Sequence, residues 1–239
     1  MQQYFAEKVN GKFRLKEKDQ YHLETVMRVR DGDEILIIFE GEQYLCSYKK
    51  NGKDYEITEI AKLDHNPELG KRITVYQALI RNENFDMVIQ KATELGASRI
   101  VPTIFERNVV KIPKERENFK LERFQAIAKG ASEQSHRTVI SEVLPQISIK
   151  DIELEDGEIG IVAYEKCEET KTLSSLEEKI INADKISIII GPEGGITPKE
   201  LQLLLDKGFI SVSLGKRILR SETATLSLLS MLDYIIEIK

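Results

Sequence analysis

Residues 188–200 read Ile-Ile-Ile-Gly-Pro-Glu-Gly-Gly-Ile-Thr-Pro-Lys-Glu, and residues 213–224 read Ser-Leu-Gly-Lys-Arg-Ile-Leu-Arg-Ser-Glu-Thr-Ala. In both stretches an apolar run that favours a β-strand breaks into a glycine-containing loop and then enters a helix. Proteins of the α/β class hold ligands in loops of this kind, at the carboxyl ends of strands. Two such loops close together in the sequence predict one shared site.

The first loop contains the glycines Gly191, Gly194 and Gly195. Glycine adopts backbone conformations that are closed to other residues and lets the main chain approach a ligand closely. The spacing matches neither the phosphate-binding Gly-x-x-x-x-Gly-Lys-Ser/Thr loop nor the dinucleotide-binding Gly-x-Gly-x-x-Gly loop, since Ile196 stands five residues after Gly191. Mononucleotide and dinucleotide binding therefore lose their main support. A tight turn without any ligand is the alternative.

The helix after the first loop has clear start and stop signals. Thr197 is typical of an N-cap, Pro198 of the first helical position, and Glu200 completes a capping box with Thr197. Gly208 favours a left-handed cap at the end of the helix. These signals predict a helix over residues 198–207.

Strand-like and helical patterns alternate from residue 72 onward. Strands are expected over 73–79, 99–105, 159–164, 185–190 and 210–214. Helices are expected over 119–133, 173–181, 198–207 and 222–237, and where Phe85, Val88, Ile89, Ala92 and Leu95 form one apolar face. This alternation predicts an α/β fold with a mostly parallel sheet covered on both faces. The apolar arc of the last helix suits burial against the sheet or a second subunit.

Residues 1–70 have a different pattern, in which short strand-like runs such as 34–39 and 55–60 are separated by turn signals. The turns are Asp31-Gly32-Asp33, Glu40-Gly41-Glu42 and Asn51-Gly52-Lys53. Closely spaced hairpins of this kind predict a small antiparallel barrel. A linker is expected over residues 65–70.

A short helix is also expected within this first part, over residues 18–28. Leu23, Val26 and Met27 are predicted to face inward from it.

The composition is ordinary for a soluble protein, with 41% hydrophobic and 31% charged residues among 239. No apolar run reaches the roughly 18 residues of a membrane span, and the amino terminus lacks a signal pattern, so the cytoplasm is the expected location. Cys46 and Cys167 are isolated, which predicts neither a disulfide framework nor a zinc site. His22, His65 and His136 are far apart, so no metal is expected. Hydrolase chemistry has no support, because no Gly-x-Ser-x-Gly motif is present.

The net charge of −5 is unevenly distributed. Residues 107–129 contain seven basic and three acidic side chains, whereas residues 150–185 contain five basic and eleven acidic ones. A local basic stripe can bind a phosphate backbone whatever the total charge. A solvated helix face with internal ion pairs is the alternative, so charge alone leaves RNA binding open.

The two loops and three further blocks keep a common order over residues 73–235. They are Gln90–Gly96, Glu106–Asn108 with Val110 and Lys111, Glu133-Gln134 with Arg137, Ile190–Gly195 and Leu214–Ala224. In these blocks the chain resembles the RsmE family of 16S ribosomal RNA uridine N3-methyltransferases, members of the SPOUT superfamily. One departure is Gln3 before Tyr4-Phe5, where the family usually has arginine. A phosphate contact from that arm is therefore not expected.

The resemblance implies a two-domain protein with S-adenosylmethionine as its cofactor. Residues 1–70 would form a PUA-like, RNA-binding barrel, and residues 71–239 a SPOUT methyltransferase domain whose chain forms a deep trefoil knot. It also implies a homodimer with the knots at the interface, and 16S ribosomal RNA of the small subunit as the substrate.

A site for S-adenosylmethionine needs apolar walls for the adenine and main-chain groups for its edge. The two loops are expected to supply them, and the resemblance implies the end of the strand at 159–164 as the third side of the pocket. The candidate cofactor-binding residues are Tyr164, Ile190, Gly191, Pro192, Glu193, Gly194, Gly195, Leu214, Gly215, Ile218, Leu219 and Thr223. Ordinary core packing is the alternative for the aliphatic side chains, and it is favoured for Ile188 and Ile189.

Uracil N3 must lose a proton before it attacks the methyl group. Arg220 is the candidate for stabilising the charge that spreads onto the flanking oxygens, because a guanidinium presents a fixed fork of donors. Glu222 is the candidate base if partial burial strengthens its hold on a proton. Alternatively, Glu222 only complements the dipole of the last helix, and Arg220 pairs with it or binds RNA.

Candidate RNA contacts lie in both parts of the chain. They are Arg28, Arg30, Arg107, Asn108, Lys111, Glu133, Gln134 and Arg137. Arg107 and Asn108 have side chains that can reach an RNA phosphate or ribose. The resemblance implies the others: Arg28 and Arg30 match a family pattern in the amino-terminal part, and Glu133, Gln134 and Arg137 match a family block associated with the active face. A local ion pair between Glu133 and Arg137, four residues apart, is the alternative for that pair.

The leading hypothesis is methylation of uridine N3 in small-subunit ribosomal RNA. One alternative is a SPOUT enzyme that acts on a ribose 2′-hydroxyl or on transfer RNA. A second alternative, from another class, is a non-catalytic RNA-binding protein with a degenerate cofactor pocket.

Overall fold

The computed structural model describes residues 1–52, 54–164 and 171–238, which form two compact units. Unit 1 contains Met1–Glu68 and also Ser132–Val139, and unit 2 contains the rest of the described chain. Contacts to Glu68 explain why the second segment belongs to unit 1. The Glu68 carboxylate pairs with Arg137 at 2.6 Å and accepts the backbone N–H groups of Thr138 and Val139.

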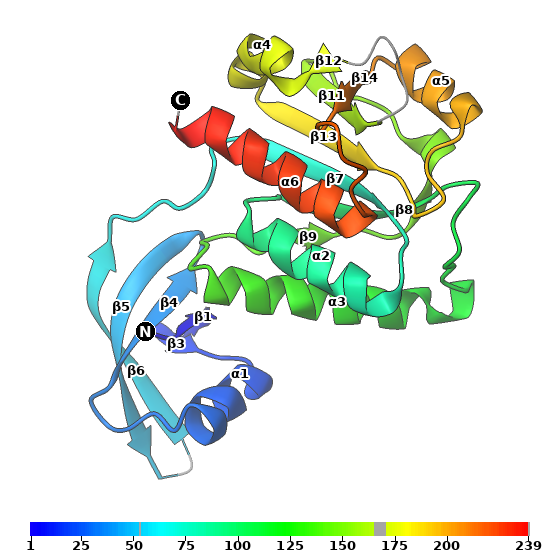
Figure 1. The fold of residues 1–239 in the computed structure, drawn as a ribbon. Coiled ribbons are helices and arrows are strands. Elements are labelled where there is room, and N and C mark those ends of the chain that lie inside the picture. Colours follow the sequence, from blue (N-terminus) through cyan, green and yellow to red (C-terminus); the bar gives the residue numbers. More distant parts are fainter. Residues whose placement is uncertain (53, 165–170, 239) are drawn as a thin grey trace. The chain divides into compact units, whose positions relative to one another are not determined.

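Unit 1 is built on a four-stranded sheet in the order β1-β4-β5-β6 (Figure 1). The strands are β1 (Gln3–Phe5), β4 (Glu34–Phe39), β5 (Glu42–Asn51) and β6 (Asp54–Leu63). β4, β5 and β6 are antiparallel, as the turn signals predicted, whereas β1 pairs parallel to β4. A separate hairpin joins β2 (Glu7–Val9) to β3 (Lys12–Arg14).

The turn between β4 and β5 confirms its sequence signal. Glu40 and Gly41 both have positive φ, 51° and 78°, which is the backbone of a tight hairpin turn. The third predicted turn ends at Lys53, which lies outside the described residues.

The predicted helix over residues 18–28 is shorter and is wound differently. It consists of α1 (Glu17–Tyr21) followed by a single π-helical turn, η1 (His22–Val26). Leu23 is buried as expected, but Val26 is 57% exposed and Met27 40% exposed. The inward assignment of these two residues is wrong, because Val26 is the last residue of the π turn and Met27 is already its C-cap, where the chain leaves the helix.

Unit 2 contains an eight-stranded sheet in the order β10-β8-β7-β13-β11-β14-β12, with β9 also paired to β8. Its strands are β7 (Arg72–Ala78), β8 (Arg99–Ile104), β9 (Glu142–Val143), β10 (Ile147–Ser148), β11 (Glu158–Ala163), β12 (Lys171–Thr172), β13 (Lys185–Ile190) and β14 (Ile210–Ser213). Every described pairing in it is parallel. The predicted parallel sheet is confirmed, although the two-residue strands were too short to show a pattern.

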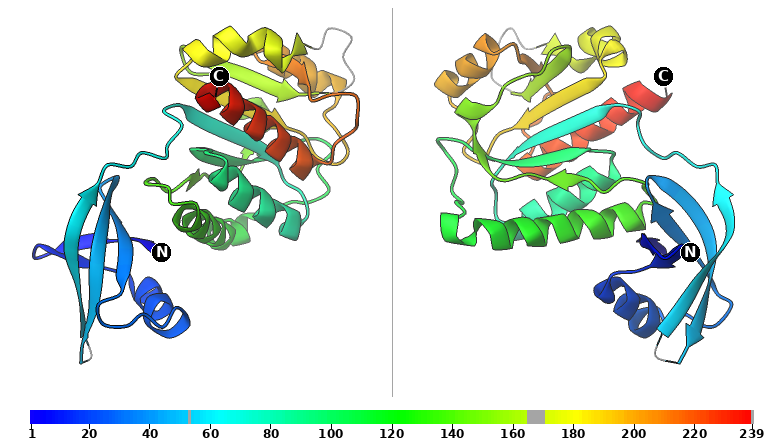
Figure 2. Two further views of the ribbon diagram at one scale, coloured as in Figure 1. Left: turned by 60° about the vertical axis from the view of Figure 1, so that its left-hand side comes forward. Right: turned by 180° about the vertical axis from the view of Figure 1, so that it is seen from behind.

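Helices cover both faces of this sheet. They are α2 (Asn82–Glu94), α3 (Lys114–Gln134), α4 (Glu177–Asn182), α5 (Pro198–Asp206) and α6 (Ser221–Asp233), with short turns η2 (Ile149–Asp151), η3 (Leu173–Leu176) and η4 (Tyr234–Ile238). Ile188 of β13 packs on the face that carries α2, α3, α4 and α6, and Ile189 packs on the face of α5. Both are buried completely, as a central parallel strand requires. Figures 1 and 2 show α2 and α6 side by side on their face.

The helix signals around the first loop are confirmed in detail. The Thr197 side chain accepts the Glu200 N–H, the Glu200 carboxylate accepts the Thr197 N–H, and Gly208 has a φ of 92°. α3, in contrast, begins five residues before its predicted start at 119. Its first turn, residues 114–118, has no apolar residue that could mark a helical period.

Cys46 lies in the core of unit 1, where burial raises the pKa of its thiol to about 12. Cys167 lies outside the described residues. Among the helices that the structure describes, none has the length and apolar character needed to cross a bilayer.

Candidate active site

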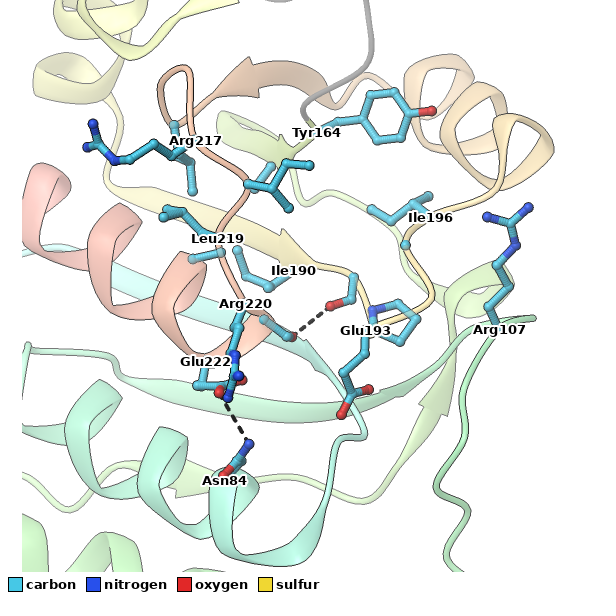
Figure 3. A pocket seen from close by; sticks show the side chains of 18 of the residues that line it. Asn84, Arg107, Tyr164, Ile190, Glu193, Ile196, Arg217, Leu219, Arg220 and Glu222 are labelled. Atoms are coloured by element: carbon cyan, nitrogen blue, oxygen red, sulfur yellow. Dashed lines mark hydrogen bonds between the residues drawn. The ribbon is translucent and has the colours of Figure 1, made fainter.

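A cavity of about 590 Å³ opens where the carboxyl ends of β7, β11, β13 and β14 meet (Figure 3). Its walls come from both glycine-containing loops and from the segments that follow β7, β8 and β11. The lining residues are Arg81, Asn84, Arg107, Val109, Ala163, Tyr164, Ile190, Gly191, Pro192, Glu193, Gly195, Ile196, Leu214, Gly215, Arg217, Ile218, Leu219, Arg220, Ser221, Glu222 and Ala224. The two loops therefore converge on one site, as the sequence predicted.

A buried hydrogen-bond chain joins the two loops. Ser221, the first residue of α6, donates its hydroxyl to the Gly191 carbonyl at 2.7 Å. The Gln77 side chain, fully buried at the end of β7, donates to Ser221 Oγ at 2.9 Å. Thr225, one turn further along α6, donates to the side-chain oxygen Oε1 of Gln77. These contacts connect β7, the first loop and α6 directly.

Ten of the twelve candidate cofactor-binding residues line the cavity, and Thr223 and Gly194 do not. Thr223 follows Ser221 by two positions, about 200° around the helix, and its side chain is exposed away from the cavity. The structure therefore does not bring Thr223 to the cavity.

Gly194 has a different partner from the one expected. A Cβ atom at this position would lie 2.9 Å from Cβ of Arg107 and 3.2 Å from its carbonyl oxygen, and Arg107 donates to the Gly194 carbonyl at 3.1 Å. The absent side chain therefore makes room for Arg107 rather than for a ligand. Of the glycines in this loop only Gly195 has a positive φ, 73°.

Arg220 and Glu222 both line the cavity, at the start of α6. The Glu222 side chain is buried, 8% exposed, and accepts a hydrogen bond from Asn84 Nδ2 at 3.2 Å. Figure 3 shows the side chains of Asn84 and Glu222 pointing toward each other. Arg220 is exposed, and none of the ion pairs between described residues includes it. The alternative in which Arg220 pairs with Glu222 is therefore not formed.

Sequence reasoning missed the contribution of the segment after β7. Arg81 and Asn84 stand at the beginning of α2 and reach the cavity from there. The rule that ligands sit at the carboxyl ends of strands applies to β7 as well, and it would have pointed to these residues. Arg217, in the second loop, also lines the cavity and was not among the candidate residues.

Two candidate RNA contacts are occupied by structural interactions. Asn108 is 9% exposed, accepts the Phe105 N–H and donates to the Leu79 carbonyl. Arg137 is 4% exposed and forms its ion pair with Glu68. The structure thus gives both side chains buried structural roles, and neither is carried into the proposed RNA contacts.

The other RNA candidates lie at accessible positions. In unit 1, Arg28 and Arg30 are exposed, and Arg28 has a positive φ of 55°. In unit 2, Arg107 and Lys111 are exposed beyond the end of β8. Near the end of α3, Glu133 is half-buried and Gln134 is exposed.

Gln3 has a structural role in unit 1. Its side chain is 3% exposed, donates to the Arg137 carbonyl at 2.7 Å and accepts from Gln43 at 2.8 Å. The side-chain amide of Gln3 therefore holds β1 to Gln43 of β5 and to the backbone at Arg137. In the described part of the chain, no group of three or more His, Cys, Asp or Glu side chains is arranged to hold a metal ion.

A family model for the RNA methyltransferase domain matches residues 67–233, which include every residue that lines the cavity. The chain belongs to the RNA methyltransferase family. Ribosomal RNA small subunit methyltransferase E of Bacillus subtilis is 31% identical, over 98% of this chain and 96% of that protein. The Aquifex aeolicus protein of the same name is 30% identical, over 97% and 99%.

A solved structure agrees with this membership. Ribosomal RNA small subunit methyltransferase E from Neisseria gonorrhoeae, crystallised with S-adenosyl methionine, superposes with a TM-score of 0.86 at 26% identity and covers 98% of each chain. The RNA methyltransferase fold of this chain therefore extends over both units.

Proposed function

We propose that this RNA methyltransferase transfers a methyl group from S-adenosylmethionine to N3 of a uridine in 16S ribosomal RNA of the small ribosomal subunit. The observation that carries the proposal is the single cavity between the two loops, with apolar walls and open main chain on one side and Arg220, Glu222 and Asn84 on the other. The name of the Bacillus subtilis relative supports ribosomal RNA of the small subunit as the substrate. The S-adenosyl methionine bound in the Neisseria gonorrhoeae structure supports the cofactor.

The residues present fit S-adenosylmethionine. Ile190, Leu214 and Leu219 offer apolar surface for an adenine ring, and the main chain beside Gly191 and Gly215 offers donors and acceptors for its edge. Tyr164, Pro192, Glu193, Gly195 and Ile218 complete the proposed cofactor site. When bound, the cofactor supplies an electrophilic methyl group.

The chain's own residues would prepare the acceptor. Glu222, shielded from water and fixed by Asn84, takes the proton from uracil N3. Arg220 donates to the flanking carbonyl oxygens as negative charge spreads onto them. The freed nitrogen lone pair forms the new N–C bond while the bond from the methyl carbon to sulfur breaks. Walls that exclude water strengthen both interactions.

The finer features of the fold form part of the same proposal. We take residues 1–70 as a PUA-like barrel and residues 71–239 as a SPOUT domain with a deep trefoil knot. The short tie between Ser221 and Gly191 supports close crossing of the two loops. A homodimer in the cytoplasm is proposed with them, and light scattering should give twice the 27.4 kDa chain mass.

RNA contacts are proposed for the exposed candidates. Arg28 and Arg30 would serve in unit 1, and Arg107 and Lys111 beside the cavity, with Glu133 and Gln134 at the end of α3. The four cationic side chains in this set would position an RNA backbone and carry no base specificity.

Mass mapping of ribosomal RNA from a deletion strain tests the proposal. One uridine in 16S RNA should lose a methyl group on its base, and the purified protein should restore it. A methyl group missing from a ribose, or from transfer RNA, would favour the alternative SPOUT activities. Absence of calorimetric heat with S-adenosylmethionine at millimolar concentration would favour a non-catalytic RNA-binding protein.

A further inference from the structure

Glu200 is a buried carboxylate that does more than cap its helix. It is 7% exposed, and its Oε2 accepts both the Thr197 N–H and the Thr197 hydroxyl at 2.9 Å. A capping box needs one carboxylate oxygen for this purpose. The second oxygen is therefore free to bind elsewhere.

That second oxygen reaches a distant part of the chain. Glu200 Oε1 accepts the backbone N–H of Glu106 at 2.7 Å, a residue 94 positions earlier in the sequence. Glu106 belongs to the segment that leaves β8 beside the cavity. Hydrogen bonds to a charged, buried acceptor are short and strong, so Glu200 joins α5 and the first loop to this segment.

The same segment is held at two more points. Asn108 accepts the Phe105 N–H at 2.8 Å and donates to the Leu79 carbonyl at 2.9 Å. Arg107, between them, donates to the Gly194 carbonyl and occupies the space where a side chain at Gly194 would stand. With its neighbours fixed on both sides, Arg107 keeps its exposed guanidinium at the edge of the cavity (Figure 3).

We propose that Glu200 is a positioning residue that acts through the Glu106 N–H to hold Arg107 at the cavity, where the guanidinium binds one phosphate of the RNA strand that delivers the uridine. This inference rests on the proposed RNA substrate. Arginine suits the role because its planar fork matches two phosphate oxygens. Glu200 itself contacts neither RNA nor cofactor.

The Glu200→Gln variant tests this with almost no change in shape. Each carboxylate oxygen accepts N–H groups, so the new amide NH₂ meets another donor in either orientation. We expect faster hydrogen exchange at Glu106. We also expect an RNA dissociation constant raised about tenfold at low salt and a raised KM for RNA, with kcat and cofactor affinity nearly unchanged.

Salt dependence separates positioning from simple stabilisation. The logarithm of the RNA association constant falls as the logarithm of the salt concentration rises. Loss of one phosphate contact makes this slope less steep by about 0.7 for single-stranded RNA. Arg107→Ala and Glu200→Gln should each lower it by this amount, and the double variant by no more than either. Thr197→Ala, which removes the cap hydroxyl but keeps the Glu106 contact, should lower Tm and leave the slope unchanged.

The proposal would be overturned if the slope changes of Arg107→Ala and Glu200→Gln added up in the double variant. It would also be overturned if Thr197→Ala changed the slope as much as Glu200→Gln does. An unchanged slope in Glu200→Gln would overturn it as well. The proposed function fails independently, if the wild-type chain binds RNA but neither binds S-adenosylmethionine nor methylates. Direct RNA binding by fluorescence anisotropy still tests the role of Glu200 in that case.

Discussion

Arg107 and Asn108 adjoin in the chain but carry their side chains into opposite environments. Asn108 satisfies two main-chain groups in the interior, and Arg107 extends to the cavity beside Gly194. A buried amide with complete hydrogen bonding specifies one loop conformation. The interior residue thus determines where its exposed neighbour is presented.

Replacement of Gly194 by alanine should displace the first loop while the fold survives. The new Cβ would lie 2.9 Å from Arg107 Cβ, which is closer than two side-chain carbons can approach. Either the first loop or Arg107 must therefore move. We expect affinity for S-adenosylmethionine to fall about tenfold, measured by calorimetry. Gly130→Ala is the control: nothing lies within 4 Å of its Cβ position in α3, and about 0.5–1 kcal/mol of stabilisation is expected. Unchanged affinity in Gly194→Ala would show that the loop is no wall of the cofactor site.

Arg220→Ala should lower turnover and spare the cofactor. Loss of one donor to developing negative charge typically lowers kcat about 10²–10³-fold, whereas the proposed cofactor walls are other residues. Single-turnover methylation and calorimetry measure the two effects. Lys216, an exposed cation of the same loop that does not line the cavity, provides the control Lys216→Ala. Equal turnover in the two variants would contradict the charge-stabilising role.

At the scale of elements, β7, the first loop and α6 meet through three polar side chains. Gln77, Ser221 and Thr225 are all buried, and their hydrogen bonds replace those that water would make. A fully paired polar network of this kind stabilises one arrangement of its elements. It sets the distance between the strand end and the start of α6, and with it one wall of the cavity.

Ser221→Ala should destabilise unit 2, because the Gly191 carbonyl and the Gln77 amide lose their common partner. The NH₂ group of the Gln77 amide keeps only its bond to the Ala78 carbonyl, and a lost partner of a buried polar group costs about 1–3 kcal/mol. Urea denaturation of the variant measures the change in the free energy of unfolding. In the control Ser174→Ala, an exposed hydroxyl is removed, and a change within about 0.5 kcal/mol is expected. A similar small change in Ser221→Ala would mean that water or a neighbour replaces the hydroxyl.

In unit 2, the cavity and a cluster of ion pairs lie at opposite ends of the sheet. The cavity occupies the carboxyl ends of the strands. The amino ends of β7 and β13 carry Arg72 and Lys185, which both pair with Glu155 from the turn before β11. Arg99 of β8 lies 4.0 Å from the same carboxylate. This ion-pair cluster joins three strands far from the site.

The Glu155 cluster predicts a pH-dependent contribution to stability. The hydrogen bond from Lys185, followed by that from Arg72, lowers the pKa of Glu155 below its usual value. A lowered pKa in the folded state stabilises the protein above the unfolded pKa, and this contribution disappears as pH falls through the folded pKa. Glu155→Gln should therefore lower Tm by a few degrees at most near neutral pH, because the pairs are exposed.

The difference in Tm between wild type and Glu155→Gln should begin to shrink as pH falls below the usual glutamate pKa of about 4.3, and it should vanish once pH passes below the lowered pKa of folded Glu155. Thermal melts from pH 7 to pH 3 measure it. Asp156→Asn, next to it in the same turn, removes a charge without a described ion pair. A difference that persists at the lowest pH would mean that the glutamine disturbs packing rather than charge.

Local physics explains which features of the fold were predictable. The capping box at Thr197, the left-handed Gly208, the parallel strand at 185–190 and the apolar face of α2 depend on neighbours in the sequence. Short strands such as β9 and β10 carry no period. Their pairing with β8 depends on the sheet that is already formed.

The sequence by itself determined the α/β alternation, both ligand-type loops and most of the residues that line the cavity, because glycine turns, caps and apolar periods are encoded by adjacent residues. Only the tertiary structure decided that Gly194 makes room for Arg107, that Asn84 holds Glu222, and that Glu200 reaches Glu106. Each of these contacts joins residues far apart in the chain. A residue type shows which hydrogen bonds it can form, and the fold determines which partner lies within reach.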